Sequence, residues 1–409
     1  MTRNVAITSV GCITTLGNNV SDIWRSLLMD CSGIDAITSF NAEAYTCNLG
    51  AEVKKFNKRS LPINGKNMLN TVNVLELKAI VEIIDNIGED SKLDNEKGAI
   101  FLGNQIIHTD TETIQVTVNV CKSNGDLQFS MLGDKQKSIP PLSGVKLLPT
   151  VPSHFIAKVF NIHGEGCIQY NSETSGIMNL VLAAEQILHN NLDYAIVCSA
   201  FSPFNPYEFM LLCRLGMMKK DNPRLNQYQY LDSFNKQSGG TIYGEGAAAV
   251  LIESEESADK MGRKILGYIK GGDVSIYPGE TYMDITADGF CRSIRNSLDK
   301  ASYNTSEIDT VFTNACAYQP WDLSEWKAIT KTWNLEKTRI INIKRNLGFS
   351  GCASGLIDCV IATKSLQSSE LLPSVNKCPN ISRVKKIMIQ SGGLGGNHSS
   401  IIIGNNDEK

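Results

Sequence analysis

Glu173 occupies a position at which enzymes often hold a reactive side chain. Residues 166–188, GCIQYNSETSGIMNLVLAAEQIL, have the pattern of a strand that turns sharply into an apolar helix. Unpaired backbone N–H groups at the start of a helix favour negative charge, and activated nucleophiles are found on such turns. Two interpretations stay open at this point. Either Glu173 is a functional group, or it complements the helix dipole while Ser172 or Thr174 caps the helix.

Cys316 is the second candidate. It lies in residues 312–329, FTNACAYQPWDLSEWKAI, just after an expected strand, where α/β proteins often place site residues. A buried thiol becomes a nucleophile only with a base or positive charge beside it, and no histidine is near Cys316 in the sequence. The pattern therefore favours a structural cysteine. A role as a new nucleophile would need a base that is close only in space.

Three further segments contain charged or glycine-rich patterns. Residues 342–360, NIKRNLGFSGCASGLIDCV, place Lys344 and Phe349 before a small-residue loop, and Lys344 is either an electrostatic anchor or a solvated charge. Residues 391–404, SGGLGGNHSSIIIG, lack the Lys-Ser/Thr ending of a phosphate loop and predict a tight turn between strands. Glu245 directly precedes a buried strand, where its carboxylate could orient a neighbouring loop by hydrogen bonds.

The elements that would position these residues alternate between strands and helices, which predicts an α/β protein. Strand-like runs occupy residues 5–10, 99–102, 195–198, 248–252, 265–269, 310–313 and 387–389, and helical patterns occupy 23–28, 176–189 and 355–366. The charged stretch 253–263 predicts a solvated helix or connection. It divides the chain into residues 1–253 and 254–409, each with a glycine-containing turn that opens an apolar helix. Two similar α/β halves are therefore expected.

Composition narrows the class of partner. The chain has 409 residues, 42% of them hydrophobic, and a formal net charge of -3 with acidic and basic residues interspersed. No nucleic-acid or membrane-surface partner is expected, and no apolar run approaches the ~18 to 20 residues that span a bilayer. We find no secretory signal pattern and no metal-ligand spacing among the scattered cysteines, so we expect a cytoplasmic protein with reduced thiols and no metal site.

The order and spacing of these segments resemble the β-ketoacyl synthase family over essentially the whole chain. The opening NVAITSVGCITTLGN, the central SPFNPYEFMLLCRLGMMKK and DSFNKQSGGTIYGEGAAAVLIE, and the closing GGLGG each resemble a segment of that family. The resemblance implies a thiolase-like fold, in which two pseudo-symmetric α/β halves form five layers (αβαβα). It also implies an obligate dimer.

The same resemblance implies that the catalytic positions have changed. Active members have a cysteine nucleophile on the elbow, two histidines and a lysine. By motif, Glu173 stands in place of the cysteine, Cys316 and Phe349 in place of the histidines, and Lys344 is retained. Leu394 replaces the phenylalanine of the closing turn. A carboxylate cannot carry a reversible acyl thioester, and phenylalanine cannot donate a hydrogen bond, so no catalytic set is intact.

Loss of these groups with the fold retained is typical of the chain length factor branch of type II polyketide synthases. The resemblance implies a non-catalytic subunit that pairs with an active ketosynthase and lines part of a tunnel for a poly-β-keto chain, here of an aromatic polyketide. The chain would be built from malonyl units on an acyl carrier protein, whose phosphopantetheine arm makes a separate cofactor unnecessary. Many members have glutamine at the elbow, and Glu173 differs from them.

The tunnel and the partner interface are expected near residues 104–113 and 140–154. The residues assigned to them by resemblance are Asn104, His108, Thr109, Thr113, Glu173 and Leu394. Three alternatives stay open: a decarboxylating ketosynthase-like enzyme that makes an acetyl-carrier starter, a partner subunit of an aryl-polyene or fatty-acid-type ketosynthase, and a scaffolding homologue outside polyketide assembly.

Overall fold

The computed structural model of the chain is built on one sheet of ten strands. It describes residues 3–54, 61, 64–88, 96–105, 111–220, 231–235, 238–376 and 381–406. The strands of this sheet are β1 (Val5–Thr14), β4 (Gly98–Asn104), β7 (Glu165–Tyr170), β8 (Tyr194–Phe201), β9 (Gly246–Ser254), β10 (Gly267–Ile276), β11 (Thr310–Phe312), β12 (Arg339–Ile341), β13 (Lys386–Gly393) and β14 (Asn397–Gly404). Most of these strands are buried along nearly their whole length, as expected for a sheet that is covered on both faces.

The strand order, β12-β11-β13-β14-β10-β1-β9-β8-β4-β7, divides between β10 and β1 into two halves with the same pattern. In the first half, β1 and β8 are antiparallel to β9, whereas β8, β4 and β7 are parallel. In the second half, β10 and β13 are antiparallel to β14, whereas β13, β11 and β12 are parallel. The halves join where Val5 pairs with Ile269 and Ile7 with Gly267. The expected pseudo-symmetric α/β halves are confirmed.

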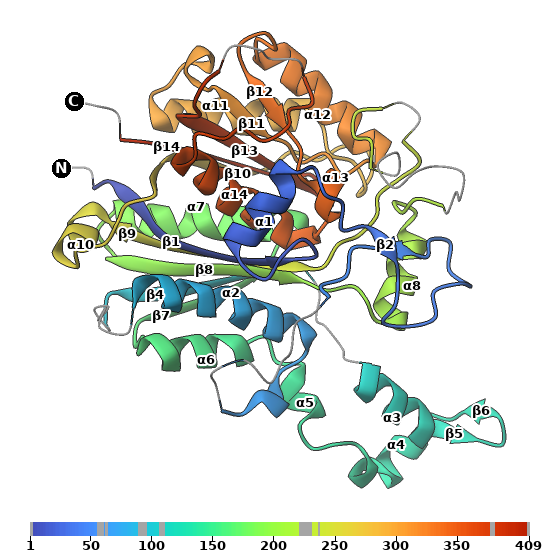
Figure 1. Cartoon of the computed structure of the whole chain (residues 1–409). Coiled ribbons are helices and arrows are strands. Elements are labelled where there is room, and N and C mark those ends of the chain that lie inside the picture. Colours follow the sequence, from blue (N-terminus) through green and yellow to red (C-terminus); the bar gives the residue numbers. More distant parts are fainter. Residues whose placement is uncertain are drawn as a thin grey trace.

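Helices cover both faces of each half, which gives five layers (Figure 1). The central layer contains α1 (Val20–Leu28), α7 (Ser175–Leu188) and α14 (Ser354–Gln367). One outer layer contains α2 (Thr71–Ile87) and α6 (Val151–Phe160), and the other contains α11 (Ala287–Ala301) and α12 (Gln319–Thr332). This is the αβαβα arrangement that the family resemblance implies.

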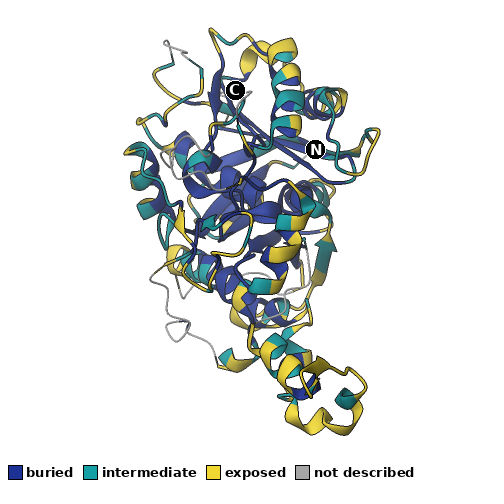
Figure 2. Ribbon diagram, turned by 90° about the vertical axis from the view of Figure 1, so that its right-hand side faces the viewer, coloured by how far each residue is buried: buried dark blue, intermediate teal, exposed yellow. Residues whose placement is uncertain are grey.

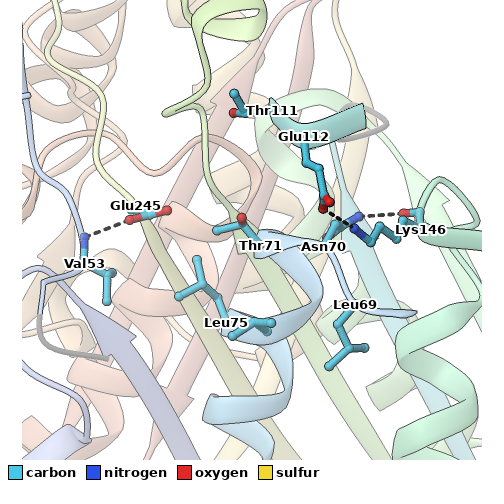
Figure 3. Close-up of a pocket in the computed structure, with 10 residues that line it drawn as sticks. Val53, Leu69, Asn70, Thr71, Leu75, Thr111, Glu112, Lys146 and Glu245 are labelled. Carbon is cyan, nitrogen blue, oxygen red and sulfur yellow. Dashed lines mark hydrogen bonds and ion pairs between the residues drawn. The ribbon is translucent and has the colours of Figure 1, made fainter. Parts of the chain in front are cut away.

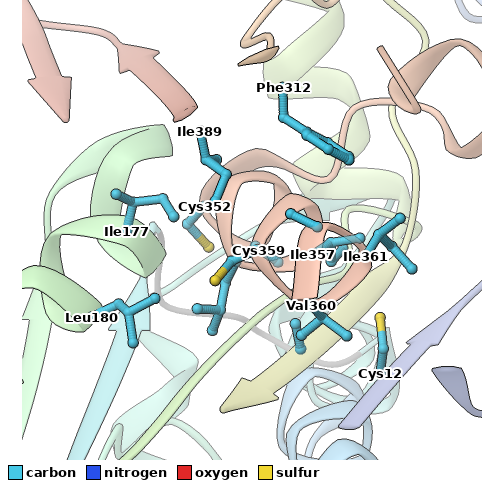
Figure 4. Close-up of a cluster of buried hydrophobic side chains, with 14 of the residues drawn as sticks. Cys12, Ile177, Leu180, Phe312, Cys352, Ile357, Cys359, Val360, Ile361 and Ile389 are labelled. Atoms are coloured by element: carbon cyan, nitrogen blue, oxygen red, sulfur yellow. The ribbon is translucent and has the colours of Figure 1, made fainter. Parts of the chain in front are cut away.

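The burial of each helix follows from its layer. In α14, every residue except Lys364 and Gln367 is buried, as expected for a helix that packs on both sides. Figure 4 shows its Ile357, Val360 and Ile361 beside side chains of α7, β1 and β13. In contrast, α11 is amphipathic, and its buried face includes residues 290, 294 and 298, which are spaced four apart.

An arm, defined here as residues 111–148, projects from the body (Figures 1 and 2). It consists of α3 (Thr111–Cys121), β5 (Lys122–Ser123), β6 (Asp126–Leu127), α4 (Met131–Asp134), η3 (Gln136–Ser138) and α5 (Ser143–Lys146). Large apolar side chains of the arm lie open to solvent: Val118, Leu127, Phe129, Leu147 and Leu148. The most exposed of them is Phe129, at 65%.

The stretch 253–263 differs from its prediction in part. Glu253 belongs to β9 and is fully buried, because its carboxylate pairs with Arg263 (2.7 Å, Nη1 to Oε1) and accepts the Thr8 hydroxyl (2.5 Å). Only α10 (Glu255–Lys260) forms the solvated helix. The expected division between residues 253 and 254 falls one residue before the end of β9, and the chain enters the second half at Gly267.

The remaining elements are the helix α8 (Pro206–Leu215) and the short elements β2 (Asp35–Ala36), β3 (Leu49–Gly50), η2 (Lys66–Met68), η4 (Ser172–Thr174), η5 (Thr305–Glu307), α13 (Lys344–Leu347) and η6 (Gly351–Ala353). Within the described ranges, no helix combines the length and the apolar character needed to cross a bilayer.

Candidate functional site

The elbow between β7 and α7 has strained backbone geometry. Ser172 has a φ of 55°, in the left-handed region that residues other than glycine seldom adopt. The Ser175 hydroxyl fixes the turn, since it accepts the Asn171 N–H (2.7 Å) and donates to the Asn104 carbonyl (2.8 Å). The capping interpretation is wrong, because neither Ser172 nor Thr174 accepts a helix N–H. The Thr174 hydroxyl donates instead to the Asn171 carbonyl at 2.9 Å.

Glu173 is 1% exposed, and its carboxylate accepts three hydrogen bonds. The Gln105 side-chain amide donates at 2.8 Å, the Leu394 backbone N–H donates at 2.9 Å, and the Ser172 hydroxyl also donates. Gln105 in turn accepts the Cys352 N–H of η6 at 3.2 Å. Burial raises the pKa of Glu173, although these hydrogen bonds favour the ionised form. The carboxylate therefore links the elbow to the end of β4, to the closing turn and, through Gln105, to η6.

The closing turn between β13 and β14 lies against this carboxylate. A Cβ on Gly393 would be 2.5 Å from Glu173 Oε2 and 3.1 Å from Glu173 Cβ, so a side chain there would displace the Glu173 carboxylate. The Ser391 hydroxyl donates to the Glu173 carbonyl at 3.4 Å. Gly395 and Gly396, with φ of 78° and 73°, make the tight turn that the sequence predicts. The turn therefore fills the space beside the Glu173 carboxylate.

Cys316 lies just after β11 and is fully buried. Asp322 of α12 holds its loop by accepting the N–H groups of Cys316 (2.9 Å) and Ala317 (3.1 Å). Burial raises the pKa of the Cys316 thiol well above its usual range, and the negative charge of Asp322 raises it further. The thiol is therefore protonated at neutral pH and is not an activated nucleophile.

Phe349 is also fully buried and lies between two aromatic rings. Its ring centroid is 5.9 Å from that of Tyr243 and 6.4 Å from that of Trp321. Backbone hydrogen bonds to Ile242 (2.8 Å) and from Gly244 (3.0 Å) fix the segment. The Tyr243 hydroxyl has no partner among the described residues, and burial together with the charge of Glu173 raises its pKa well above the usual range. An aromatic cluster fills this position.

Lys344 is a buried anchor, 3% exposed. Its ammonium donates to the Thr313 carbonyl at 2.8 Å and pairs with Asp358 of α14. Burial raises the pKa of Asp358 to about 6, against the lowering effect of the Lys344 charge. Glu325 of α12 is a further buried acid, which accepts the Asn314 N–H at 2.7 Å and whose pKa burial raises to about 8. These groups position the loops that carry Cys316 and Phe349.

A cavity of about 450 Å³ lies where the arm joins the body (Figure 3). It is lined by Val53, Leu69, Asn70, Thr71, Val74, Leu75, Thr111, Glu112, Lys146 and Glu245. A neighbouring cavity of about 390 Å³ shares Val53, Thr71, Thr111 and Glu245 with it. Glu245 accepts the Val53 N–H (2.8 Å) and the Ser202 hydroxyl (2.5 Å), so it orients a neighbouring loop as the sequence predicts.

Family models match nearly the whole chain. The model described as "Beta-ketoacyl synthase, N-terminal domain" matches residues 2–258, and "Beta-ketoacyl synthase, C-terminal domain" matches residues 267–377. The chain belongs to the β-ketoacyl synthase family. Its thiolase-like fold agrees with this assignment.

Curated relatives of this ketosynthase-family chain have different activities. It is 25% identical to 3-oxoacyl-[acyl-carrier-protein] synthase 2 of Coxiella burnetii, with 98% of each chain covered. It is 22% identical to a polyketide biosynthesis malonyl-ACP decarboxylase of Bacillus subtilis, with 98% of this chain and 96% of the relative covered.

Solved structures share the fold at lower identity. The ishigamide ketosynthase/chain length factor has a TM-score of 0.86 at 20% identity, with all of both chains covered. The TM-score is 0.85, at 17% identity, for a type II polyketide synthase acyl carrier protein in complex with its hexaketide-bound ketosynthase. That match covers 99% of this chain and 100% of the other.

The fold brings together some of the residues that the sequence singles out. Glu173 and Leu394 are in direct contact, and Asn104 accepts the Ser175 hydroxyl with its backbone carbonyl. Thr113 lies in the arm, where its hydroxyl donates to that of Ser143 at 3.3 Å. His108 and Thr109 lie outside the described residues. Within the described part of the chain, no cluster of three His, Cys, Asp or Glu side chains is arranged to hold a metal ion.

Several residues of the site were missed by the sequence reasoning, among them Gln105, Asp322 and Tyr243. Gln105 and Asp322 are ordinary polar residues in the sequence, and only tertiary contacts reveal their roles. Tyr243 carried a weak signal, as an aromatic residue inside the glycine-rich run TIYGEG. A bulky side chain among glycines is a reason to expect close packing at that position.

Proposed function

We propose that this chain is the non-catalytic, chain-length-determining subunit of a heterodimeric type II polyketide ketosynthase. The proposal rests on the burial of the three side chains at the positions that motif resemblance assigns to catalysis. Glu173, Cys316 and Phe349 are each at most 1% exposed and are held by neighbouring groups of the same chain. A thioester site needs an accessible nucleophile and donors for a developing oxyanion. The side chains at these positions supply neither.

In this proposal the partner subunit performs the chemistry. Its cysteine would hold the growing chain while its histidines decarboxylate malonyl units delivered on the phosphopantetheine arm of an acyl carrier protein. The present chain would close the far end of the tunnel and so limit the number of extensions, here of an aromatic polyketide. The cavity at the base of the arm supports this, because residues 111–112 and 146 border it and lie in the two expected tunnel segments. The fold shared with a ketosynthase/chain length factor is consistent with it.

Decarboxylation is the second candidate, because the malonyl-ACP decarboxylase of Bacillus subtilis is a relative over 98% of this chain. A decarboxylase must stabilise an enolate, which requires donors or positive charge at the carbonyl. Phe349 offers neither, and the buried Cys316 thiol donates only weakly. The geometry therefore favours the chain length subunit.

Coexpression tests the two functions. The tagged chain is produced with its neighbouring ketosynthase and carrier protein, and the complex is assayed by pull-down and product mass analysis. We expect a one-to-one complex that makes a polyketide of defined length, with activity lost when the partner's cysteine is replaced. Conversion of malonyl-carrier to acetyl-carrier protein by this chain alone would instead establish the decarboxylase. Glu173→Gln, which keeps the shape but not the charge, is expected to leave product length unchanged.

A bulky substitution at the cavity tests separately whether the polyketide chain enters it. Thr71 is exposed, lies at the start of α2 and borders both cavities, so Thr71→Trp would fill space there without disturbing the core. We expect a shorter product with unchanged complex yield. Thr305→Trp, on the exposed turn η5, is the matched control. Equal product lengths for both variants would show that the chain does not enter this cavity.

Thiol labelling tests whether Cys316 could be a nucleophile. The native complex is treated with iodoacetamide and digested for mass spectrometry. Cys213 and Cys291 are half-buried and are expected to react, whereas the buried, protonated Cys316 is expected to stay unlabelled until the protein is unfolded. Rapid labelling of Cys316 in the native state would contradict the assignment.

A further inference from the structure

A polar cavity of about 310 Å³ lies away from the elbow, at the junction of the two halves. The first half contributes residues 8–10 of β1, the start of α1 and the last turns of α2. The second half contributes the end of α14, and residues 264 and 266 belong to the connection between α10 and β10. Lys364 is ten residues beyond the start of α14, so it lies roughly 15 Å along the helix from the end that faces the elbow.

Two lysines give this cavity a positive charge. Lys264 is exposed and Lys364 is half-buried, and they belong to different segments. Among the described residues, neither ammonium forms an ion pair or a hydrogen bond. Glu82 is the one acidic residue in the lining, and both of its oxygens are occupied by backbone N–H groups, from Cys12 at 2.9 Å and Val20 at 2.8 Å. The lining therefore has a net positive charge, and its one acid, Glu82, already accepts two hydrogen bonds.

The start of α1 adds hydrogen-bond donors to the same cavity. The N–H of Val20 is taken by Glu82, and that of Asp22 by the Asn19 side chain at 2.8 Å. The N–H and the hydroxyl of Ser21 have no acceptor among the described residues, and Ser21 lines the cavity. The Asp22 carboxylate, which is not part of the lining, pairs with Arg25 at 3.4 Å. An N-terminal amide with free lysines beside it is a suitable anion cradle.

Ser9 adds an independent observation. It lies next to the irregularity in β1, where the pairing with β9 shifts between Ile7 and Ser9. Ser9 is 1% exposed, lines the cavity, and its hydroxyl has no partner among the described residues. A buried hydroxyl without a partner is costly unless a bound group satisfies it.

From these features we infer that the cavity bordered by Lys264, Lys364, Ser21 and Ser9 is a binding site for a phosphate group, carried either by free phosphate or by a small phosphate monoester. Five donor groups on these four residues border a cavity whose one acid already accepts two hydrogen bonds, which matches an oxyanion with several acceptor oxygens. The site contacts both halves of the fold, so a bound anion would hold them together. It does not depend on the function proposed above.

Titration of the full chain, as it purifies with or without a partner subunit, tests the inference. Inorganic phosphate, glycerol 3-phosphate and sodium chloride at matched ionic strength are compared by isothermal titration calorimetry and by the thermal unfolding midpoint. We expect saturable binding of phosphate and a rise in the midpoint that chloride does not reproduce. Tighter binding of the monoester would identify an organic phosphate as the ligand, and equal or weaker binding would identify free phosphate.

Two variants test whether phosphate binds in this cavity. Lys264→Gln with Lys364→Gln is expected to weaken phosphate binding by roughly tenfold, whereas Lys331→Gln with Lys337→Gln removes the same charge elsewhere and is expected to have no effect. Ser21→Asp places a carboxylate in the cradle at a position where acids favour a helix, so it should block phosphate while the unliganded midpoint is kept. Absence of saturable binding, or wild-type affinity in either cradle variant, would overturn the inference.

Discussion

At the elbow, the surroundings of Glu173 match a carboxylate and not a nucleophile. The Gln105 amide and the Leu394 N–H both donate to it, and Gly393 leaves room for its oxygen. A side chain held in this way connects segments that are far apart in sequence, which is a structural role. Glutamate at position 173 therefore excludes a thioester at this position and also contributes to the packing of the site.

Glu76 carries a prediction of pH dependence. It is fully buried on α2, accepts one long hydrogen bond from Asn73 (3.3 Å), and burial raises its pKa from 4.5 to about 8. The raised pKa means that Glu76 is protonated in the folded state at neutral pH. Its stabilising contribution is complete below pH 4.5 and is lost as pH rises towards 8, by about 1.4 kcal/mol per pH unit.

Glu76→Gln removes this titration while keeping the shape of the side chain. We expect little change in the free energy of unfolding at pH 5 and a gain of a few kcal/mol at pH 8, measured by urea denaturation. Glu185→Gln, which makes the same change of side chain at a half-exposed position on α7, is the control. Parallel profiles for Glu76→Gln and the wild type would mean that Glu76 is ionised in the folded protein.

Single residues also mark the limit of sequence reasoning. The chemical identities at positions 173, 316 and 349 could be read from motifs, because the motifs are local. The partners Gln105 and Asp322 could not, since Gln105 and Glu173 are 68 positions apart and meet only through packing. The burial of a residue is also difficult to predict from the sequence. Glu253 lies in a charged run, yet its ion pair with Arg263 is buried.

At the scale of elements, the alternation of strands and helices was sufficient to predict an α/β protein with two similar halves, whereas the five layers followed from the family resemblance. Apolar runs locate the strands, and the two glycine-containing turns locate the helices of the central layer. What the pattern could not give is which elements contact one another at the site. The contact of the closing turn with the elbow depends on β13 and β14 lying beside η4, which tertiary packing alone determines.

Gly393→Ala tests the contact between turn and elbow. The added Cβ would clash with Glu173 Oε2, so we expect a loss of about 1–3 kcal/mol in the free energy of unfolding. Removal of the carboxylate in Gly393→Ala with Glu173→Ala should relieve much of the clash, so the double variant should lose less than the sum of the single losses. Gly144→Ala is the control, because a Cβ there meets nothing within 4 Å. Additive losses would contradict direct packing.

At the scale of the whole molecule, the two edges of the sheet differ. The β12 edge is covered, because Ile340 donates to the Asn376 side chain (2.9 Å) and accepts the Val375 N–H (2.7 Å). The β7 edge pairs only with β4 among the described strands, and Tyr170 at its end is 42% exposed. An open edge favours pairing with another chain. This asymmetry and the apolar side chains of the arm both support a partner subunit.

The double variant Phe129→Ser with Leu127→Ser tests whether the arm belongs to the interface with a partner subunit. These side chains are 65% and 52% exposed, so the substitutions should leave the fold of this chain intact, as circular dichroism would show. Large apolar anchors commonly contribute 2 kcal/mol or more to an interface, so we expect roughly a thirtyfold loss of affinity for the proposed ketosynthase partner in a pull-down titration. Tyr282→Ser, an equally exposed aromatic position in the second half, is the control. If affinity is unchanged in the arm variant, the partner binds elsewhere, and the β7 edge becomes the surface to test.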